Sequence, residues 1–172
     1  IKDFLELSEV KKTIFLTPDL DYKKEVKKAI KHSKIKIFKQ HTYETEPTKL
    51  TKQIEKITNY DVRKQNLADE ILRVENSDLM DKEEQIKKLD KRYTIGNVNF
   101  DSVIISDFDE NLKSVITSLI YTDVSPRNKL FITLNQWFDE SLLLEENIQP
   151  LYYPSINKQN LETFNKKFVE TY

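Results

Sequence analysis

Residues 12–17, with the sequence KTIFLT, form a short apolar run between charged residues and a proline. A run of this length and composition predicts a buried β-strand. Beyond the proline, the spacing of Tyr22, Val26 and Ile30 predicts a helix that begins near residue 20, with Asp19 as its N-terminal cap. The opening of the chain is therefore a strand followed by a helix.

The same alternation continues to the end of the chain. We place the other strands at residues 35–39, 103–106, 130–134 and 151–153, and the other helices near 47–57, 112–119, 139–146 and 161–172. Parallel strands need long crossover connections, which alternating helices supply. The pattern thus predicts an α/β fold: an open, five-stranded parallel sheet in the order 2-1-3-4-5 with helices on both faces.

An extra helical segment interrupts the alternation between the second and third strands. Apolar residues recur at helical spacing through residues 60–74 and again through 79–93, with a break at Asn76-Ser77-Asp78. Residues 58–94 are therefore predicted to be an inserted helical hairpin. Because isolated helices of this length are marginal, we expect it to pack against the main body.

Composition narrows the function classes. The chain has 172 residues, enough for one domain, and its formal net charge of −1 argues against a polybasic nucleic-acid binder. It has no cysteine, one glycine and no apolar run of 18 residues, which excludes thiolate chemistry, glycine-rich phosphate loops and a membrane-inserted segment. Nothing points to a metal, a cofactor or an enzymatic activity.

Ligands of open parallel sheets bind beyond the carboxyl ends of the strands. Four residues at these ends are candidate contacts: Tyr22, Asp107, Asn135 and Trp137. Three of them also have a structural interpretation, because Tyr22 and Trp137 can pack a helix onto the sheet and Asp107 can cap one. We favour helix capping for Asp107 or Asp109 over the phospho-accepting role of a response-regulator receiver.

Two further features, a lysine-rich segment and the two histidines, are first interpreted as ordinary surface residues. The lysine-rich face of residues 23–39 could meet phosphate or an anionic polymer, but a solvated helix face is the default. His32 and His41 flank the predicted second strand, too far apart to share a metal, and His41 at its carboxyl end is the better functional candidate.

Several segments together resemble the penicillin-binding-protein activator (LppC-like) branch of the type 1 periplasmic ligand-binding proteins. They are residues 11–22, 43–46, 57–63 (ITNYDVR), 95–105 (IGNVNFDSVII), 123–127 (DVSPR) and 137–139 (WFD), and the hairpin is similar to an insertion in that branch.

The resemblance implies that residues 1–172 are one lobe, the second, of a longer two-lobed protein. It implies a periplasmic protein held at the outer membrane as a lipoprotein through an upstream segment. Members do no catalysis; they bind and stimulate a class A penicillin-binding protein. Sister branches bind amino acids or other small solutes, and in such a lobe Asp107 would meet the ligand amine.

Overall fold

The computed structural model describes residues 1–134, 144–154 and 158–171. Its centre is a five-stranded, all-parallel sheet in the order β2-β1-β3-β4-β5, which confirms the predicted fold class and strand order. The strands are β1 (Thr13–Pro18), β2 (Lys39–Tyr43), β3 (Ser102–Ile105), β4 (Leu130–Thr133) and β5 (Leu151–Tyr152).

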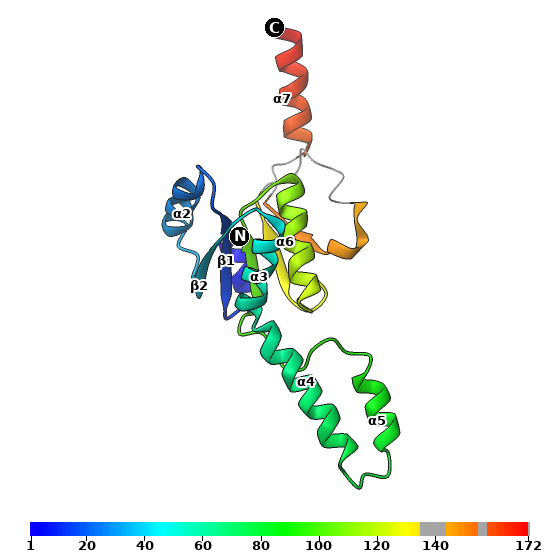
Figure 1. Cartoon of the computed structure of the whole chain (residues 1–172). Helices are drawn as coiled ribbons and strands as arrows, with labels where there is room; N and C mark the ends of the chain where they lie inside the picture. The colour runs from blue at the N-terminus through cyan, green and yellow to red at the C-terminus, as the bar shows by residue number, and fades with distance from the viewer. Residues whose placement is uncertain (135–143, 155–157, 172) are drawn as a thin grey trace.

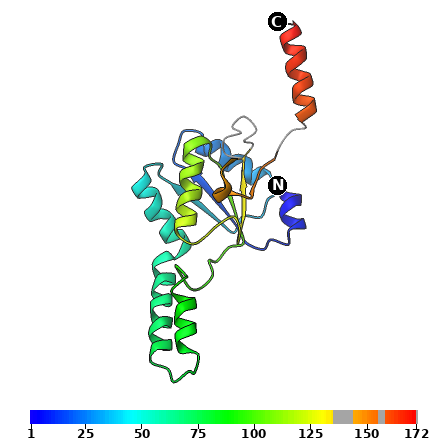
Figure 2. The same cartoon turned by 90° about the vertical axis from the view of Figure 1, so that its right-hand side faces the viewer.

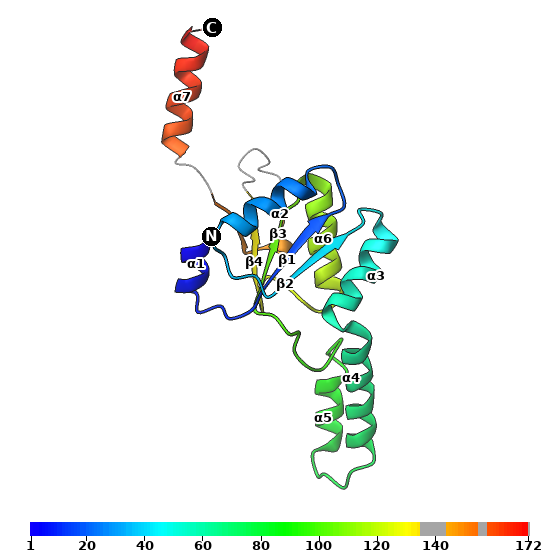
Figure 3. The same cartoon turned by 90° about the vertical axis from the view of Figure 1, so that its left-hand side faces the viewer.

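Helices cover both faces of the sheet (Figures 1 and 3). On one face lie α3 (Pro47–Thr58), α6 (Asp109–Tyr121) and a short 3-10 turn, η2 (Glu146–Ile148); on the other lie α1 (Lys2–Leu7) and α2 (Lys23–His32). The inserted hairpin consists of α4 (Tyr60–Glu75) and α5 (Lys82–Leu89), and the last helix is α7 (Lys158–Thr171). The sequence pattern had not predicted α1.

Side chains of the central strands alternate between two apolar clusters. In β1, Ile14 and Leu16 join the cluster beneath α3 and α6, whereas Phe15 joins the cluster beneath α1 and α2. In β3, Ile104 likewise faces the side opposite to that of its neighbour Ile105. Because both faces are buried, these strands are continuous apolar runs rather than alternating ones.

The second strand was predicted four residues too early. Ile35 and Ile37 lie before β2 and pack against the cluster beneath α1 and α2, while the paired residues are 39–43. His41 therefore lies within the strand, opposite Leu16, and not beyond its end. Apolar alternation marked residues that pack on the sheet, whereas the paired segment KQHTY is mostly polar because it forms the sheet's edge.

Asp19 does not cap α2. The helix begins after Tyr22, at Lys23, without a side-chain hydrogen bond at its cap, and the Asp19 carboxylate instead accepts a hydrogen bond from the Lys23 ammonium. The Asp19 backbone N–H donates to the Tyr43 carbonyl at 2.7 Å, so this residue ties the end of β1 to the end of β2.

The helical hairpin exists as predicted, but it does not pack against the body. It projects away from the sheet and touches it only near its base (Figures 1 and 2). No residue of α5 is buried, and its contacts are with α4. The expectation of close packing was wrong because only a few side chains at the base of α4, such as Tyr60 and Arg63, face the body.

The last helix, α7, also stands apart from the sheet (Figure 1). In α7, Phe164 and Phe168 are 63 % and 55 % exposed and stack on each other with ring centroids 6.2 Å apart. The predicted helix at 139–146 falls mostly outside the described residues. Among the described helices, none combines the length and the apolar character needed to cross a bilayer.

Candidate functional site

Three polar residues meet at the carboxyl ends of β1, β2 and β3. Two of them, Tyr22 and Asp107, were predicted from the sequence, and the third, Tyr43, was not. Asp107 follows β3, Tyr43 ends β2, and Tyr22 precedes α2 after the turn that leaves β1. Asp107 and Tyr43 are each 1 % exposed, whereas Tyr22 is half-buried. The predicted pair Tyr22 and Asp107 is therefore in contact, and Tyr43 completes the cluster.

Both tyrosine hydroxyls donate hydrogen bonds to the Asp107 carboxylate. The Tyr43 hydroxyl donates to Oδ2 at 2.5 Å, and the Tyr22 hydroxyl donates to Oδ1 at 3.2 Å. The Phe108 backbone N–H also donates to Oδ1, at 2.9 Å. Hydrogen bonds to an ionised acceptor are the strong ones, and a buried carboxylate needs several of them.

The environment holds both phenols in their protonated form. Burial raises the pKa of Tyr43, and the negative charge and hydrogen bond of Asp107 raise it further. The same causes, in the same order, raise the pKa of Tyr22 well above its ordinary value. These hydroxyls therefore act as hydrogen-bond donors and not as bases or nucleophiles at physiological pH.

Neither Asp107 nor Asp109 occupies the N-cap position of α6. The residue before α6 is Phe108, and the helix has no side-chain hydrogen bond at its N-terminal cap. The Asp107 carboxylate accepts a hydrogen bond from the Phe108 backbone N–H at the start of the helix. Asp109 is the first residue of the helix, with φ at +50°. The Asp107 side chain turns toward the tyrosines because their donors lie at the neighbouring strand ends.

The other two predicted contacts, Asn135 and Trp137, lie outside the described residues. Asp107 is a buried carboxylate, and each of its two oxygens accepts a hydrogen bond from a tyrosine hydroxyl. Within residues 1–134, 144–154 and 158–171, no three side chains of histidine, aspartate or glutamate gather as a metal site would require.

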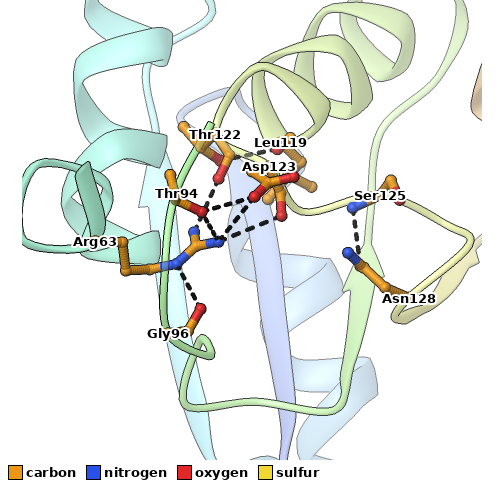
Figure 4. Close-up of polar contacts among 8 residues, drawn as sticks. All are labelled: Arg63, Thr94, Gly96, Leu119, Thr122, Asp123, Ser125 and Asn128. Carbon is orange, nitrogen blue, oxygen red and sulfur yellow. Dashed lines mark hydrogen bonds and ion pairs between the residues drawn. The ribbon is translucent and has the colours of Figure 1, made fainter. Parts of the chain in front are cut away.

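A second polar cluster lies at the opposite end of the sheet, at the base of the hairpin (Figure 4). Arg63 of α4 is 6 % exposed, and its guanidinium reaches across to the loop before β3 and to the end of α6. Its Nε donates to the Gly96 carbonyl at 3.1 Å, and Nη1 donates to the Thr122 carbonyl at 2.9 Å.

We refer to the bonds that the Arg63 guanidinium makes at the base of the hairpin as the Arg63 anchor. The second terminal nitrogen, Nη2, makes the remaining bonds of this anchor. Nη2 donates to Thr94 Oγ1 at 2.7 Å and lies 3.7 Å from Asp123 Oδ2; Thr94 in turn donates to that carboxylate at 2.6 Å. Burial lowers the pKa of Arg63, and Asp123 opposes that shift. The planar fork of an arginine suits such a site because it directs several N–H groups at once.

Gly96 has a conformational role in the same anchor. It is the only glycine of the chain and has φ at +103°, a backbone conformation that residues with a side chain rarely adopt. The turn there aims its carbonyl at Arg63, and the Ile95 N–H donates to the Arg63 carbonyl at 3.0 Å. The outgoing and returning segments at the base of the hairpin are thus bonded to each other, and the Arg63 side chain bonds them to the end of α6.

The sequence carried weak signals for the two residues that were missed. Arg63 is a basic residue on the otherwise apolar, inward side of α4, and a buried arginine needs several partners. Tyr43 is an aromatic residue at the end of a polar strand, but the strand itself was misplaced. Their partners lie 31 to 64 residues away in the chain, so sequence spacing could not pair them.

No protein-family model, curated protein or solved structure gives a significant match to this chain.

Proposed function

We propose that the chain is a non-catalytic, protein-binding lobe of a bacterial envelope protein that regulates peptidoglycan synthesis. Its partner is a class A penicillin-binding protein, and its contact surface is the helical hairpin. The observation that carries the proposal is the hairpin itself, which projects from the sheet and exposes apolar side chains.

The hairpin is suited to contact a partner. Its exposed apolar side chains include Leu72, Leu79 and Met80, the last of which is fully exposed. Exposed apolar side chains on a projecting element favour a protein contact. The anchor at Arg63 holds the base of the hairpin, which reduces the entropy lost on binding.

The sequence resemblance supplies the identity of the partner and the setting. It supports a periplasmic location, an upstream lipoprotein anchor and a first lobe elsewhere in the longer chain. These remain parts of the proposal, together with the absence of catalysis.

Binding of the chain to a purified class A penicillin-binding protein tests the proposal. The chain is expected to bind in a surface plasmon resonance experiment and to raise the rate of glycan polymerisation. The double variant Leu72→Asp/Met80→Asp should weaken binding at least about tenfold, since apolar anchors carry most interface energy.

A matched control places the same change elsewhere. Leu7→Asp alters an 84 % exposed leucine on α1 and should leave binding unchanged. Absence of binding by the unaltered chain would refute the partner. Equal weakening by the α1 variant would refute the hairpin as the contact surface.

A second candidate function is small-solute binding at the carboxyl edge of the sheet. It is favoured by the cluster of Tyr22, Tyr43 and Asp107 at the place where such sheets bind ligands. If an amino acid binds there, it should raise the midpoint temperature of thermal unfolding. At a ligand concentration of 100 times Kd, the free energy of unfolding should rise by about 2.7 kcal/mol. Tyr22→Phe should reduce the shift, and no shift with any amino acid would exclude this function.

A further inference from the structure

A basic groove is lined by residues of α2 and by residues 35–40, which lead into the edge strand β2. Figures 1 and 3 show α2 beside that edge of the sheet. The volume of the groove is about 650 Å³, and we refer to it as the lysine groove. Its lining comprises Lys27, Lys28, Ile30, Lys31, His32, Ile35, Ile37 and Gln40. Three isoleucines thus lie among basic and polar side chains.

The charge around the groove is strongly positive. Eight lysines and one glutamate occur between residues 22 and 43. In the described part of the chain, Lys23 is the only one of these lysines with a salt bridge, to Asp19. Lys28 and Lys31 are exposed. So dense a cluster of like charges raises the local concentration of an anionic partner.

The edge of β2 offers backbone groups next to the groove. β2 ends the sheet on this side, with β1 as its neighbour. The Phe38 N–H donates to the Thr13 carbonyl at 2.7 Å. This bond determines which residues of β2 turn their backbone groups toward β1. Because alternate residues of a parallel strand turn toward the same neighbour, the backbone groups of Lys39 and His41 turn away from β1.

We propose that this edge and the lysine groove together bind an extended, acidic segment of a partner protein. The segment adds a strand to the sheet beside β2. Its carboxylates point to the α2 face of the sheet and meet the lysines of α2, and the side chains between them point to the opposite face. Strand addition takes affinity from backbone hydrogen bonds and specificity from the pockets beside the edge.

The form of the surface favours a peptide over an anionic bilayer. A bilayer meets a flat or convex face and gives no hydrogen bonds to a strand edge. Here the isoleucines line a groove, and the edge residues Lys39 and Gln40 are exposed beside it. The site is separate from the hairpin, so the proposal does not depend on the proposed function.

The first experiment measures binding of a fluorescein-labelled peptide, Glu-Val-Glu-Val-Glu-Val-Glu-Val-Glu, by fluorescence anisotropy. We expect saturable binding that weakens with salt, and no binding of the peptide in which glutamine replaces every glutamate. Lys28→Glu/Lys31→Glu should weaken binding at least about tenfold. Lys52→Glu/Lys56→Glu, two exposed lysines of α3, should change it less than about threefold.

The second experiment tests the strand edge without altering the protein. Two peptides carry N-methyl groups on one or the other alternate set of residues, so each can pair along one edge only. One should lose binding and the other should keep it; equal binding of both would overturn strand addition. Binding to vesicles of phosphatidylglycerol and phosphatidylcholine, with no binding of the acidic peptide, would overturn the peptide partner.

Discussion

Replacing Arg63 with alanine is expected to lower the free energy of unfolding by about 3–5 kcal/mol. The variant removes a guanidinium that donates to the carbonyls of Gly96 and Thr122 and to Thr94. Thr94 and Thr122 are buried, and a buried acceptor that loses its partner costs about 1–3 kcal/mol. Urea unfolding followed by circular dichroism measures the change.

The same helix supplies the control for this prediction. Arg73→Ala removes an exposed arginine whose partner is Glu70, three residues earlier, and should cost less than about 1 kcal/mol. Arg63→Lys should recover only a small part of the loss, because an ammonium lacks the planar fork. Equal effects of the two alanine variants would contradict the anchoring role.

Hydrogen exchange can locate the effect of Arg63→Ala. If the arginine fixes the hairpin to the body, amides of α4 and α5 should lose protection before those of β1 and β3. A uniform loss of protection would instead mean that the junction and the sheet unfold together.

Replacing Tyr43 with phenylalanine is expected to cost about 1.5–3 kcal/mol. The change removes the 2.5 Å hydrogen bond to Asp107 and leaves a carboxylate that is 1 % exposed with one donor fewer. Tyr22→Phe is the matched variant: its hydroxyl lies at 3.2 Å on a half-buried side chain, so its loss should cost less. A larger effect at Tyr22 would contradict this order.

Alkaline pH gives an independent test of the same cluster. The pKa of Tyr43 is raised in the folded state, so the folded chain keeps its phenol protonated at a pH where the unfolded chain ionises at about 10. This contribution to stability is complete below about pH 10 and is lost as the pH rises further. Tyr43→Phe removes one such proton, so between pH 9 and pH 11 it should lose about 1.4 kcal/mol less stability in total than the unaltered chain.

Unfolding in urea at pH 9, 10 and 11 measures both slopes. The remaining tyrosines and lysines titrate in both proteins, so the difference between the slopes isolates residue 43. Parallel slopes would show that the Tyr43 phenol ionises as freely in the folded protein as in the unfolded one.

The sheet could be predicted because its information is local. Runs such as Val103–Ile105 are apolar on both faces, and the helices between them force parallel crossovers. The strand order then follows from few permitted topologies. The hairpin could be located for the same reason, since its helical spacing and the break at Asn76 are local features.

The rest depended on contacts between distant residues. β2 was misplaced because the apolar residues Ile35 and Ile37 pack beside the sheet without pairing in it, while the paired edge is polar. The direction of the hairpin depends on how Arg63 meets Thr94 and Thr122, and no spacing rule relates them. Of the predicted ligand contacts, Tyr22 and Asp107 meet because both follow strand ends, which is a topological expectation.

The geometry at the foot of the hairpin makes this part of the chain permissive to changes in length. Since Ile95 N–H bonds to the Arg63 carbonyl, the outgoing and returning segments are already joined where they leave the body. Everything between them can lengthen or shorten without changing the loop that the sheet must close. A reporter domain spliced in near residues 76–81 should therefore leave the five strands in register, and relatives of different hairpin length would be compatible with one and the same body.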